Sequence, residues 1–289
     1  MIDLHVHTTN SDGRLKVQEI LERGKAQGIS TISFCDHNVV GAYGEIIEKG
    51  LKTYGIQIIT GIEFDFVYEH KDFHMLGYNF DWKELNKSEL INKKTDEENM
   101  ECERKKLEFL KSVCKNLRIK IDENLDIKTP NDKASIVLKY HMMEFKENDL
   151  ILDEMLGKDS KKSFARGFVH NPNTPFYIDE TKGLPTAKEV ANLIHSTGGE
   201  VFLAHPFDYK DIDHKKYIQS MYDLGILDGI ECIHTRHSLE QIDFIKEFAK
   251  ENNIKISGGS DFHRDGKQRL GYGVEGTVPI TEEYLFKKL

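Results

Sequence analysis

The sequence predicts an α/β fold in which seven strand-and-helix units close into a barrel, with a mainly helical subdomain inserted into it. Two observations predict this. Short apolar runs alternate with stretches of helical spacing over residues 1–82 and again over 185–289, and this alternation favours a parallel sheet covered by helices. Residues 83–184 between them are charged, helix-prone and without a clear strand. An open, doubly wound sheet is the alternative arrangement.

Four strands are expected in the first block. Residues 2–7 alternate apolar with polar side chains, which is the period-two pattern of a strand and places His5 and His7 on one face. Apolar residues at helical spacing follow, up to Gly28. The expected strands are 2–6, 31–35, 57–62 and 73–78, and the expected helices are 17–28 and 42–54.

The inserted segment is expected to be helical. Amphipathic spacing predicts a long helix over 97–117, and the run Pro130-Asn131-Asp132 predicts the start of another that ends near 145. We interpret residues 83–184 as an inserted subdomain. The alternative is that they supply further helices of the barrel.

The strand-and-helix pattern then resumes. A helix over 187–196 ends at Gly198-Gly199, a signal for a helix C-terminus. Strands over 201–204, 229–233 and 254–257 and a helix over 239–252 complete the predicted barrel.

The composition narrows the class of protein. The formal net charge of −9 argues against sequence-independent nucleic-acid binding, so we expect no stable binding to duplex nucleic acid. No apolar stretch approaches the length of a bilayer span, and the N-terminus lacks the pattern of a secretory signal. The four cysteines have no C-x-x-C spacing, which suggests neither a disulfide framework nor a zinc knuckle. We expect a reduced, cytoplasmic protein that does not bind membranes.

Histidines and carboxylates lie in or directly after most of the predicted strands. In a parallel α/β barrel the C-terminal strand ends share one face, where active sites are built. Each such residue alone is more often structural, but a buried cluster is costly unless a metal or mutual pairing compensates it. The set therefore predicts a metal site. It comprises His5 and His7 on the first strand, Asp36-His37 after the second, Glu63 after the third, His74 in the fourth, His205 after the fifth, and Asp261 and His263 after the seventh.

These residues lie in motifs that resemble those of the PHP family, the polymerase and histidinol phosphatase superfamily. The resemblance covers about residues 1–80 and 184–275 and is loose between them. It implies a distorted, seven-stranded (β/α)7 TIM-like barrel that holds a trinuclear metal centre and hydrolyses phosphate esters. Within the family, the chain resembles the small nucleotide-phosphatase and RNase-like subgroup. The motifs are His5-Val6-His7, Ser11-Asp12-Gly13, Asp36-His37, Gly61-Ile62-Glu63, His74, Leu203-Ala204-His205-Pro206 and Gly259-Ser260-Asp261-Phe262-His263.

Carried over position by position, the resemblance implies three divalent metal ions. The mixed set of imidazoles and carboxylates suits Zn²⁺, Mn²⁺ or Fe²⁺ better than Ca²⁺. Asp36 is expected to orient a ligand or the nucleophile and not to bind metal itself. The implied ligands are His5, His7 and Asp261 for the first ion, Glu63 bridging the first and second, His74 and His205 for the second, and Asp12, His37 and His263 for the third.

Clustered divalent ions favour hydrolysis of phosphate esters. They lower the pKa of bound water from 15.7 to roughly 7 and neutralise phosphate oxygens. The predicted nucleophile is therefore a metal-bound hydroxide supported by Asp36. No side-chain nucleophile is needed, and Cys35 is expected to be a packed strand residue.

Four residues are candidates for substrate binding. Arg236 and His237 follow the sixth strand and resemble an Arg-His element that faces substrate phosphate in small PHP phosphatases. Arg236 is the stronger candidate because guanidinium binds phosphate bidentately, and a solvent-exposed loop arginine is the alternative. His234 lines the pocket or caps the following helix. Lys133, in the insertion, loosely matches an arginine of relatives and can bind phosphate only as a point charge.

Two further expectations concern specificity. The insertion over 83–184 is expected to act as a lid that selects the leaving group. Asp208 stands where some nucleotide-cleaving relatives carry an arginine, and a carboxylate there would repel an extra phosphate. This departure argues against a bisphosphate or oligonucleotide substrate.

The leading hypothesis is a metal-dependent phosphoesterase that acts on a small phosphorylated molecule. A nucleoside mono- or bisphosphate or a short oligonucleotide is the first candidate substrate, and histidinol phosphatase activity is the alternative. A non-catalytic, metal-binding regulatory module ranks lower because the ligand set is complete. A component of a polymerase or repair complex also ranks lower, because the chain is acidic and carries no attached polymerase domain.

Overall fold

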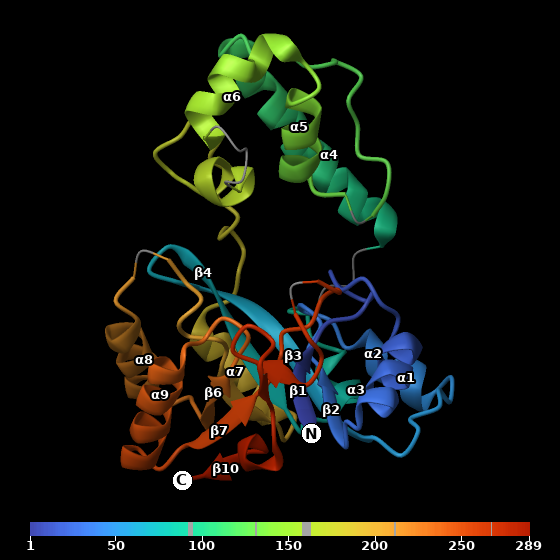
Figure 1. Cartoon of the computed structure of the whole chain (residues 1–289), viewed down its shortest axis with the longest axis vertical. Coiled ribbons are helices and arrows are strands. Elements are labelled where there is room, and N and C mark those ends of the chain that lie inside the picture. Colours follow the sequence, from blue (N-terminus) through green and yellow to red (C-terminus); the bar gives the residue numbers. More distant parts are fainter. Residues whose placement is uncertain (92–94, 131, 158–162, 211, 267) are drawn as a thin grey trace. The chain divides into compact units, whose positions relative to one another are not determined.

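The protein divides into two compact units. The computed structural model describes residues 1–91, 95–130, 132–157, 163–210, 212–266 and 268–289 (Figure 1). The first unit consists of Met1–Asn92 and Leu184–Leu289, and the second of Lys93–Gly183. Within the described residues, no helix is long and apolar enough to cross a membrane.

The first unit is built on a curled, mixed sheet of eight strands. Its order is β1-β2-β3-β4-β5-β6-β7-β10. Neighbours pair in parallel except β3 with β4, β4 with β5, and β7 with β10. The strands are β1 Ile2–Val6, β2 Thr31–Phe34, β3 Gln57–Tyr68, β4 Lys71–Tyr78, β5 Glu200–Leu203, β6 Gly229–Ile233, β7 Lys255–Gly258 and β10 Lys287–Lys288, and a separate two-stranded sheet holds β8 Tyr272–Gly273 and β9 Val278–Pro279.

The sheet departs from the expected seven parallel strands at two places. The third strand runs on to Tyr68 and returns through Glu69 and His70, whose φ angles are +46° and +60°. Two residues with positive φ make the tight turn of an antiparallel hairpin, whereas a parallel connection needs a crossover of a dozen residues or more. The second difference is β10, which pairs antiparallel with β7 and makes the count eight.

The first strand of the curled sheet is joined to the segment that follows β7. The backbone N–H of His7 donates to the Phe262 carbonyl at 3.0 Å, and the Asp261 N–H donates to the His5 carbonyl at 2.9 Å. Val6 and Phe262 also form an isolated parallel bridge. The end of β1 therefore lies beside the segment that follows β7.

Helices of the first unit pack their apolar stripes against the sheet. Amphipathic spacing and capping residues define them, as in α7, where Thr186 and Glu189 form a capping box. The helix expected over 42–54 ends at Ile47, and a helix not expected from the sequence, α8, is begun by Asp213, whose carboxylate accepts from the Lys216 N–H. The bounds are α1 Val17–Gln27, α2 Gly41–Ile47, α3 Trp82–Leu85, α7 Ala187–Ser196, α8 His214–Asp223 and α9 Leu239–Glu251, with a 3₁₀ turn η3 at Glu282–Tyr284.

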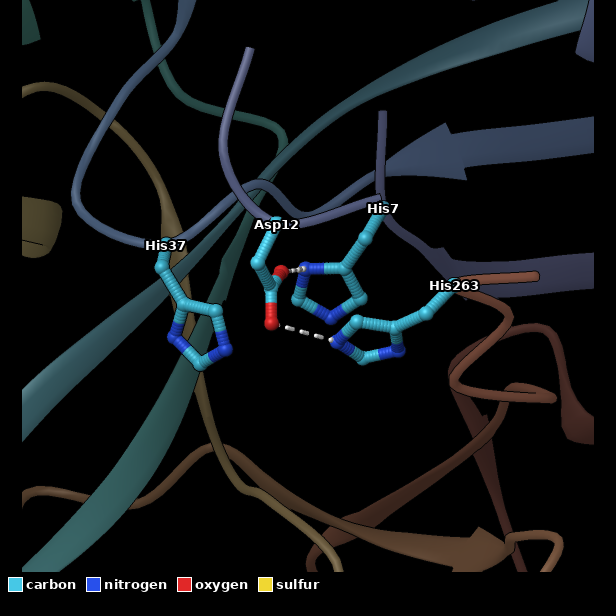
Figure 2. Close-up of side chains that lie close together, drawn as sticks. All are labelled: His7, Asp12, His37 and His263. Carbon is cyan, nitrogen blue, oxygen red and sulfur yellow. Dashed lines mark ion pairs between the residues drawn. The ribbon is translucent and has the colours of Figure 1, made fainter. Parts of the chain in front are cut away.

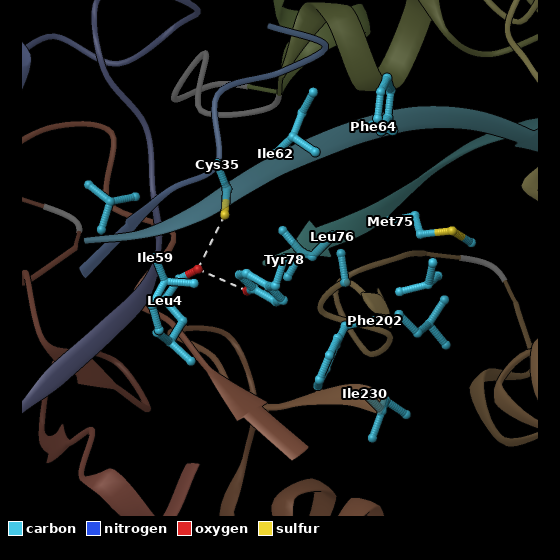
Figure 3. Close-up of a cluster of buried hydrophobic side chains, with 14 of the residues drawn as sticks. Leu4, Cys35, Ile59, Ile62, Phe64, Met75, Leu76, Tyr78, Phe202 and Ile230 are labelled. Carbon is cyan, nitrogen blue, oxygen red and sulfur yellow. Dashed lines mark hydrogen bonds between the residues drawn. The ribbon is translucent and has the colours of Figure 1, made fainter. Parts of the chain in front are cut away.

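The core of this unit fixes β1 from inside the sheet. Figure 3 shows the Tyr78 hydroxyl and the Cys35 thiol both directed at the Leu4 carbonyl, at 2.8 and 3.2 Å. Phe202 lies among these buried side chains and contacts the Tyr78 ring edge-on. Burial raises the pKa of the Cys35 thiol to about 12, so the thiolate needed for nucleophilic attack is suppressed.

The second unit is helical and has its own core. Its elements are α4 Asp96–Asn116, α5 Ala134–Met142, a 3₁₀ turn η1 Lys146–Asn148, α6 Asp149–Leu156 and a short π-helix η2 Ala165–Val169. Leu107 and Leu110 of α4 belong to a buried cluster with Leu138 and Met142 of α5. The helix expected from Pro130 begins later, at Ala134, because the Asp132 carboxylate accepts hydrogen bonds from the Lys128 and Thr129 N–H groups and forms a turn.

The second unit also holds a carboxylate whose ionisation contributes to stability. A hydrogen bond with His170, reinforced by Lys106, lowers the pKa of Glu180 from 4.5 to about 2. A lowered folded-state pKa stabilises the fold above the unfolded value, and this contribution is lost as pH falls. We therefore expect Glu180→Gln to lower the melting temperature at pH 7.

Melting curves of wild type and Glu180→Gln between pH 7 and pH 2.5 test this. The difference in melting temperature between wild type and Glu180→Gln should become smaller as pH falls from about 4.5 towards 2. Glu154→Gln, on an exposed face of α6 in the same unit, is the matched control and should behave like wild type. A difference that stayed constant over the whole pH range would contradict the ionisation argument.

Candidate active site

Glu63 is the centre around which the candidate site is arranged. Its side chain is 1% exposed, and Glu63 lies within β3, next to the antiparallel β4. Because β4 runs antiparallel to β3, His74 near its start comes to the same edge as the C-terminal ends of the parallel strands. The Glu63 carboxylate contacts five imidazoles: Oε2 lies 3.2 Å from His5 Nε2, 3.2 Å from His7 Nε2 and 3.3 Å from His37 Nε2, and Oε1 lies 3.0 Å from His74 Nδ1 and 2.8 Å from His205 Nε2.

Asp261 adds a second carboxylate to the imidazoles of β1. Its Oδ1 lies 3.1 Å from His7 Nε2 and 3.6 Å from His5 Nε2. Asp261 and His205 have φ angles of +54° and +21°. Non-glycine residues pay a conformational cost there, and such strain gathers at functional sites. The four side chains His5, His7, Glu63 and Asp261 offer ligand atoms within 4.8 Å of one another.

Asp12 gathers a second, more exposed group with His7, His37 and His263. Figure 2 shows its two carboxylate oxygens each directed at one ring, with Oδ1 3.5 Å from His7 Nδ1 and Oδ2 3.1 Å from His263 Nε2. The ligand atoms of all four residues lie within 4.8 Å of one another. Burial alone would raise the pKa of Asp12, but hydrogen bonding with His263 and the neighbouring imidazolium charges outweigh it and lower the pKa.

Asp36 shapes the loop that carries Asp12. Its carboxylate accepts hydrogen bonds from the Thr8 N–H and hydroxyl, both at 2.7 Å, and from the Ser11 hydroxyl at 2.6 Å. Gly13 closes the loop over β1, where a Cβ would lie 2.5 Å from the His7 carbonyl group. Asp36 is absent from the candidate ligand groups, and its contacts agree with an orienting role.

The site fits divalent metal ions. Around Glu63 the imidazoles face carboxylate oxygens, the donor set typical of Zn²⁺, Mn²⁺ and Fe²⁺ sites. His7 Nδ1 and His205 Nδ1 are buried and have no hydrogen-bond partner among the described residues, which leaves donor atoms for a further contact. Although burial lowers the pKa of His7, hydrogen bonds to Asp261 and Glu63 raise it to about 10, and a metal ion would take the place of that proton.

Two carboxylates that contact the candidate ligands were not predicted from the sequence. Asp65 lies two residues after Glu63 on the same face of β3, with Oδ1 2.9 Å from His37 Nδ1 and 3.5 Å from His74 Nε2. Glu231 is fully buried on β6, with Oε1 2.9 Å from His5 Nδ1, and its Oε2 accepts the His205 N–H at 2.8 Å. The period-two alternation Glu63-x-Asp65 was a usable signal for the first, whereas Glu231 lies inside an otherwise apolar strand.

Glu231 positions two candidate ligands at once, so its amide variant should weaken metal binding. Carboxylates that accept the second N–H of a ligand histidine typically change metal affinity 10–100-fold when they are removed. We expect Glu231→Gln to bind metal more weakly by about that factor. The metal affinity is measured by calorimetric titration of the metal-free protein with a divalent metal ion. Affinity equal to that of wild type would show that Glu231 only fills space.

The predicted substrate-binding residues differ in burial and in the unit to which they belong. Arg236 forms an ion pair with Asp208 at the end of the loop after β6. His234 is buried, with Nε2 3.3 Å from Asp261 Oδ2. His237 is also buried, and its Nδ1 lies 2.9 Å from the Cys232 carbonyl; burial is the main cause that lowers its pKa to about 3. Lys133 is exposed at the start of α5 in the second unit.

Comparison with known proteins decides the family. The model of the PHP domain matches residues 3–234. The chain belongs to the PHP domain family. The resemblance inferred from the motifs is thereby confirmed.

Relatives of this PHP protein are named for hydrolysis of phosphate esters. A 5'-3' exoribonuclease of Haemophilus influenzae is 27% identical, with 98% of each chain covered. A phosphoribosyl 1,2-cyclic phosphate 1,2-diphosphodiesterase of Eggerthella lenta is 24% identical over 90% of this chain and 93% of its own. A 3',5'-nucleoside bisphosphate phosphatase of Chromobacterium violaceum is 23% identical over 96% and 92%.

Solved structures show the same fold. An amidohydrolase of Chromobacterium violaceum with bound sulfate superposes with a TM-score of 0.66 at 23% identity, covering 94% of this chain and 90% of that one. A protein of Bifidobacterium adolescentis assigned as a metal-dependent phosphoesterase has a TM-score of 0.63 at 20% identity, covering 98% and 93%. The chain therefore shares its α/β fold with these two structures.

Proposed function

We propose that this PHP protein is a metal-dependent phosphoesterase whose substrate is a nucleotide, either a nucleoside mono- or bisphosphate or a short oligonucleotide. The observation that carries the proposal is the convergence of five imidazoles on the buried Glu63 carboxylate. A site of this kind holds divalent ions at one rim of the fold. The relatives act on RNA, cyclic phosphates and nucleoside bisphosphates, which supports a nucleotide.

We assign three ions to these side chains, as the resemblance implied. The described residues form four candidate groups: an inner group around His5, an outer group around Asp12, a third made of His37, Glu63 and His74, and a fourth made of Asp65, Asp72 and His74. His205 lies 3.4 Å from His74, and we propose it as a ligand together with Glu63 and His74. Zn²⁺, Mn²⁺ and Fe²⁺ all suit these donors. When bound, such ions lower the pKa of water and neutralise phosphate oxygens.

The protein's own residues then have defined tasks. Glu63 belongs to two of the candidate groups and joins them, and Asp36 fixes the loop from which Asp12 reaches the outer group. Arg236 is the proposed contact for a phosphate oxygen, because its guanidinium is partly exposed beside the site. His234, next to Asp261, lines the same region. We further propose that Lys93–Gly183 is an inserted subdomain that selects the leaving group, with Lys133 as a candidate contact.

The test is a substrate comparison with controlled metal content. Protein stripped with a chelator and reloaded separately with Mn²⁺, Zn²⁺ or Fe²⁺ is assayed on nucleoside monophosphates, 3',5'-bisphosphates, short RNA and histidinol phosphate. We expect turnover of at least one nucleotide substrate, which disappears on chelation and returns with metal. Turnover of histidinol phosphate alone would overturn the nucleotide proposal. A complete lack of turnover in every metal would favour a non-catalytic, metal-binding module.

A further inference from the structure

The ion pair between Arg236 and Asp208 lies beside the candidate metal site and bears on which phosphate group binds there. We propose that Asp208 is a specificity-determining residue, which neutralises Arg236 and so disfavours binding of dianionic phosphate relative to a monoanionic phosphodiester. The inference rests on the proposed phosphoesterase function. It concerns which phosphate group this rim accepts.

Both partners of the pair are fixed directly to the candidate metal site. Asp208 follows His205 by three residues, and its N–H donates to the His205 carbonyl at 2.9 Å. Arg236 follows His234 by two, and its N–H donates to His234 Nδ1 at 3.2 Å. The rings of His205 and His234 lie with their centroids 5.0 Å apart. The ion pair thus joins two loops, one that begins at His205 and one that begins at His234.

The pair is accessible to a ligand. The side chains of Arg236 and Asp208 are 43% and 19% exposed. Within the described part of the chain, Asp208 is the carboxylate within ion-pairing distance of this guanidinium. A phosphate that contacts Arg236 must therefore share it with Asp208 or displace the carboxylate, which stays nearby because its loop is anchored at His205.

The charges decide what the pair does to selectivity. A guanidinium alone attracts a ligand in proportion to the ligand's negative charge, so it favours a dianion over a monoanion. Adding the Asp208 carboxylate brings the net charge of the pair to zero and removes that advantage. The same arrangement weakens retention of a phosphate monoester product, because this product is a dianion whereas a diester substrate is a monoanion.

Substitution of Asp208 by asparagine keeps the shape and removes the charge. Binding of inorganic phosphate and dimethyl phosphate at pH 8 is measured by calorimetry on the metal-loaded protein, at low and at physiological salt. We expect Asp208→Asn to tighten phosphate binding about fivefold at low salt, a change at the upper end of the range of a partly exposed charge pair. Dimethyl phosphate should tighten only about twofold, because half the charge gives half the Coulomb energy.

Two further variants separate this role from a structural one. In an Arg236→Gln background the effect of Asp208→Asn on the phosphate to dimethyl phosphate ratio should become smaller, because the guanidinium for which Asp208 competes with the ligand is gone and only direct repulsion by the carboxylate remains. Asp243→Asn, on an exposed face of α9, is the matched control for net charge and should leave both affinities unchanged. Asp208→Ser repeats the measurement should the asparagine variant melt at a lower temperature.

The inference is overturned if Asp208→Asn binds both anions as wild type does, or if its effect is undiminished without Arg236. Equal tightening of both anions would also overturn it, since a charge effect must scale with ligand charge. Because the measurement records binding of the two anions, its result does not require turnover of any nucleotide. Failure of the substrate comparison above would overturn the proposed function while leaving this measurement readable.

Discussion

Glu63→Gln should leave a folded protein that has lost nearly all of its phosphoesterase activity. The carboxylate contacts five imidazoles from four strands or strand ends, and the amide can offer only one oxygen and no negative charge. Loss of a shared anionic ligand removes several kcal/mol of metal-dependent stabilisation. We expect activity to fall by at least about a thousandfold, since each 1.36 kcal/mol is tenfold in rate.

Metal content by mass spectrometry and activity on a generic phosphate ester measure the effect together. Glu247→Gln, on an exposed face of α9, is the control with the same chemical change and should retain metal and activity. If Glu63→Gln kept wild-type activity, the metal-hydrolase assignment of the site would have to be abandoned. Loss of activity with full metal content would instead assign Glu63 a role toward substrate.

Gly259→Ala is expected to have the largest effect on folding. A Cβ at Gly259 would lie 2.1 Å from His5 Cβ and 2.6 Å from the His5 backbone nitrogen. The backbone atom belongs to the buried strand β1 and cannot move aside without breaking the sheet. Overpacking of this kind costs about 1–3 kcal/mol and occasionally more, and contact with backbone places this site at the upper end.

Chemical denaturation of both variants tests the prediction. Gly167→Ala is the matched control, because no atom lies within 4 Å of a Cβ built there. We expect Gly259→Ala to lose more than about 3 kcal/mol and Gly167→Ala to change by less than about 1 kcal/mol. An alanine variant at 259 as stable as wild type would mean that β1 shifts freely, and then His5 could not be held in place.

Much of the site was predictable because strand periodicity and strand ends are local signals. His5 and His7 share a face through the alternation of residues 2–7, and Glu63, His205 and Asp261 lie where predicted strands approach or reach their C-terminal ends. The direction of β4 was not predictable in this way. It depends on a two-residue turn at Glu69 and His70, which lack the Asn-Gly signature of such turns.

The remaining features depend on contacts between distant segments. Glu231 looks like one polar residue in an apolar strand, and only the fold brings it to His5, 226 positions earlier. The pairing of Arg236 with Asp208 joins two loops in the same way. His237 was expected at the substrate by its place beside Arg236, while in the structure its ring is buried against Phe207 and His234. Its role toward substrate stays a prediction.

The junction of β1 with the segment after β7 connects the first and last parts of the first unit. Backbone hydrogen bonds of His7 and Asp261 and one isolated bridge form it, while side chains from both sides point at the same group of imidazoles and carboxylates. Ions bound there would link the first and last parts of the chain. The free energy of unfolding would then rise with the concentration of free metal through mass action. Amide hydrogen exchange at residues 5–7 and 261–263 should therefore speed up on chelation, before exchange in the middle of the sheet does.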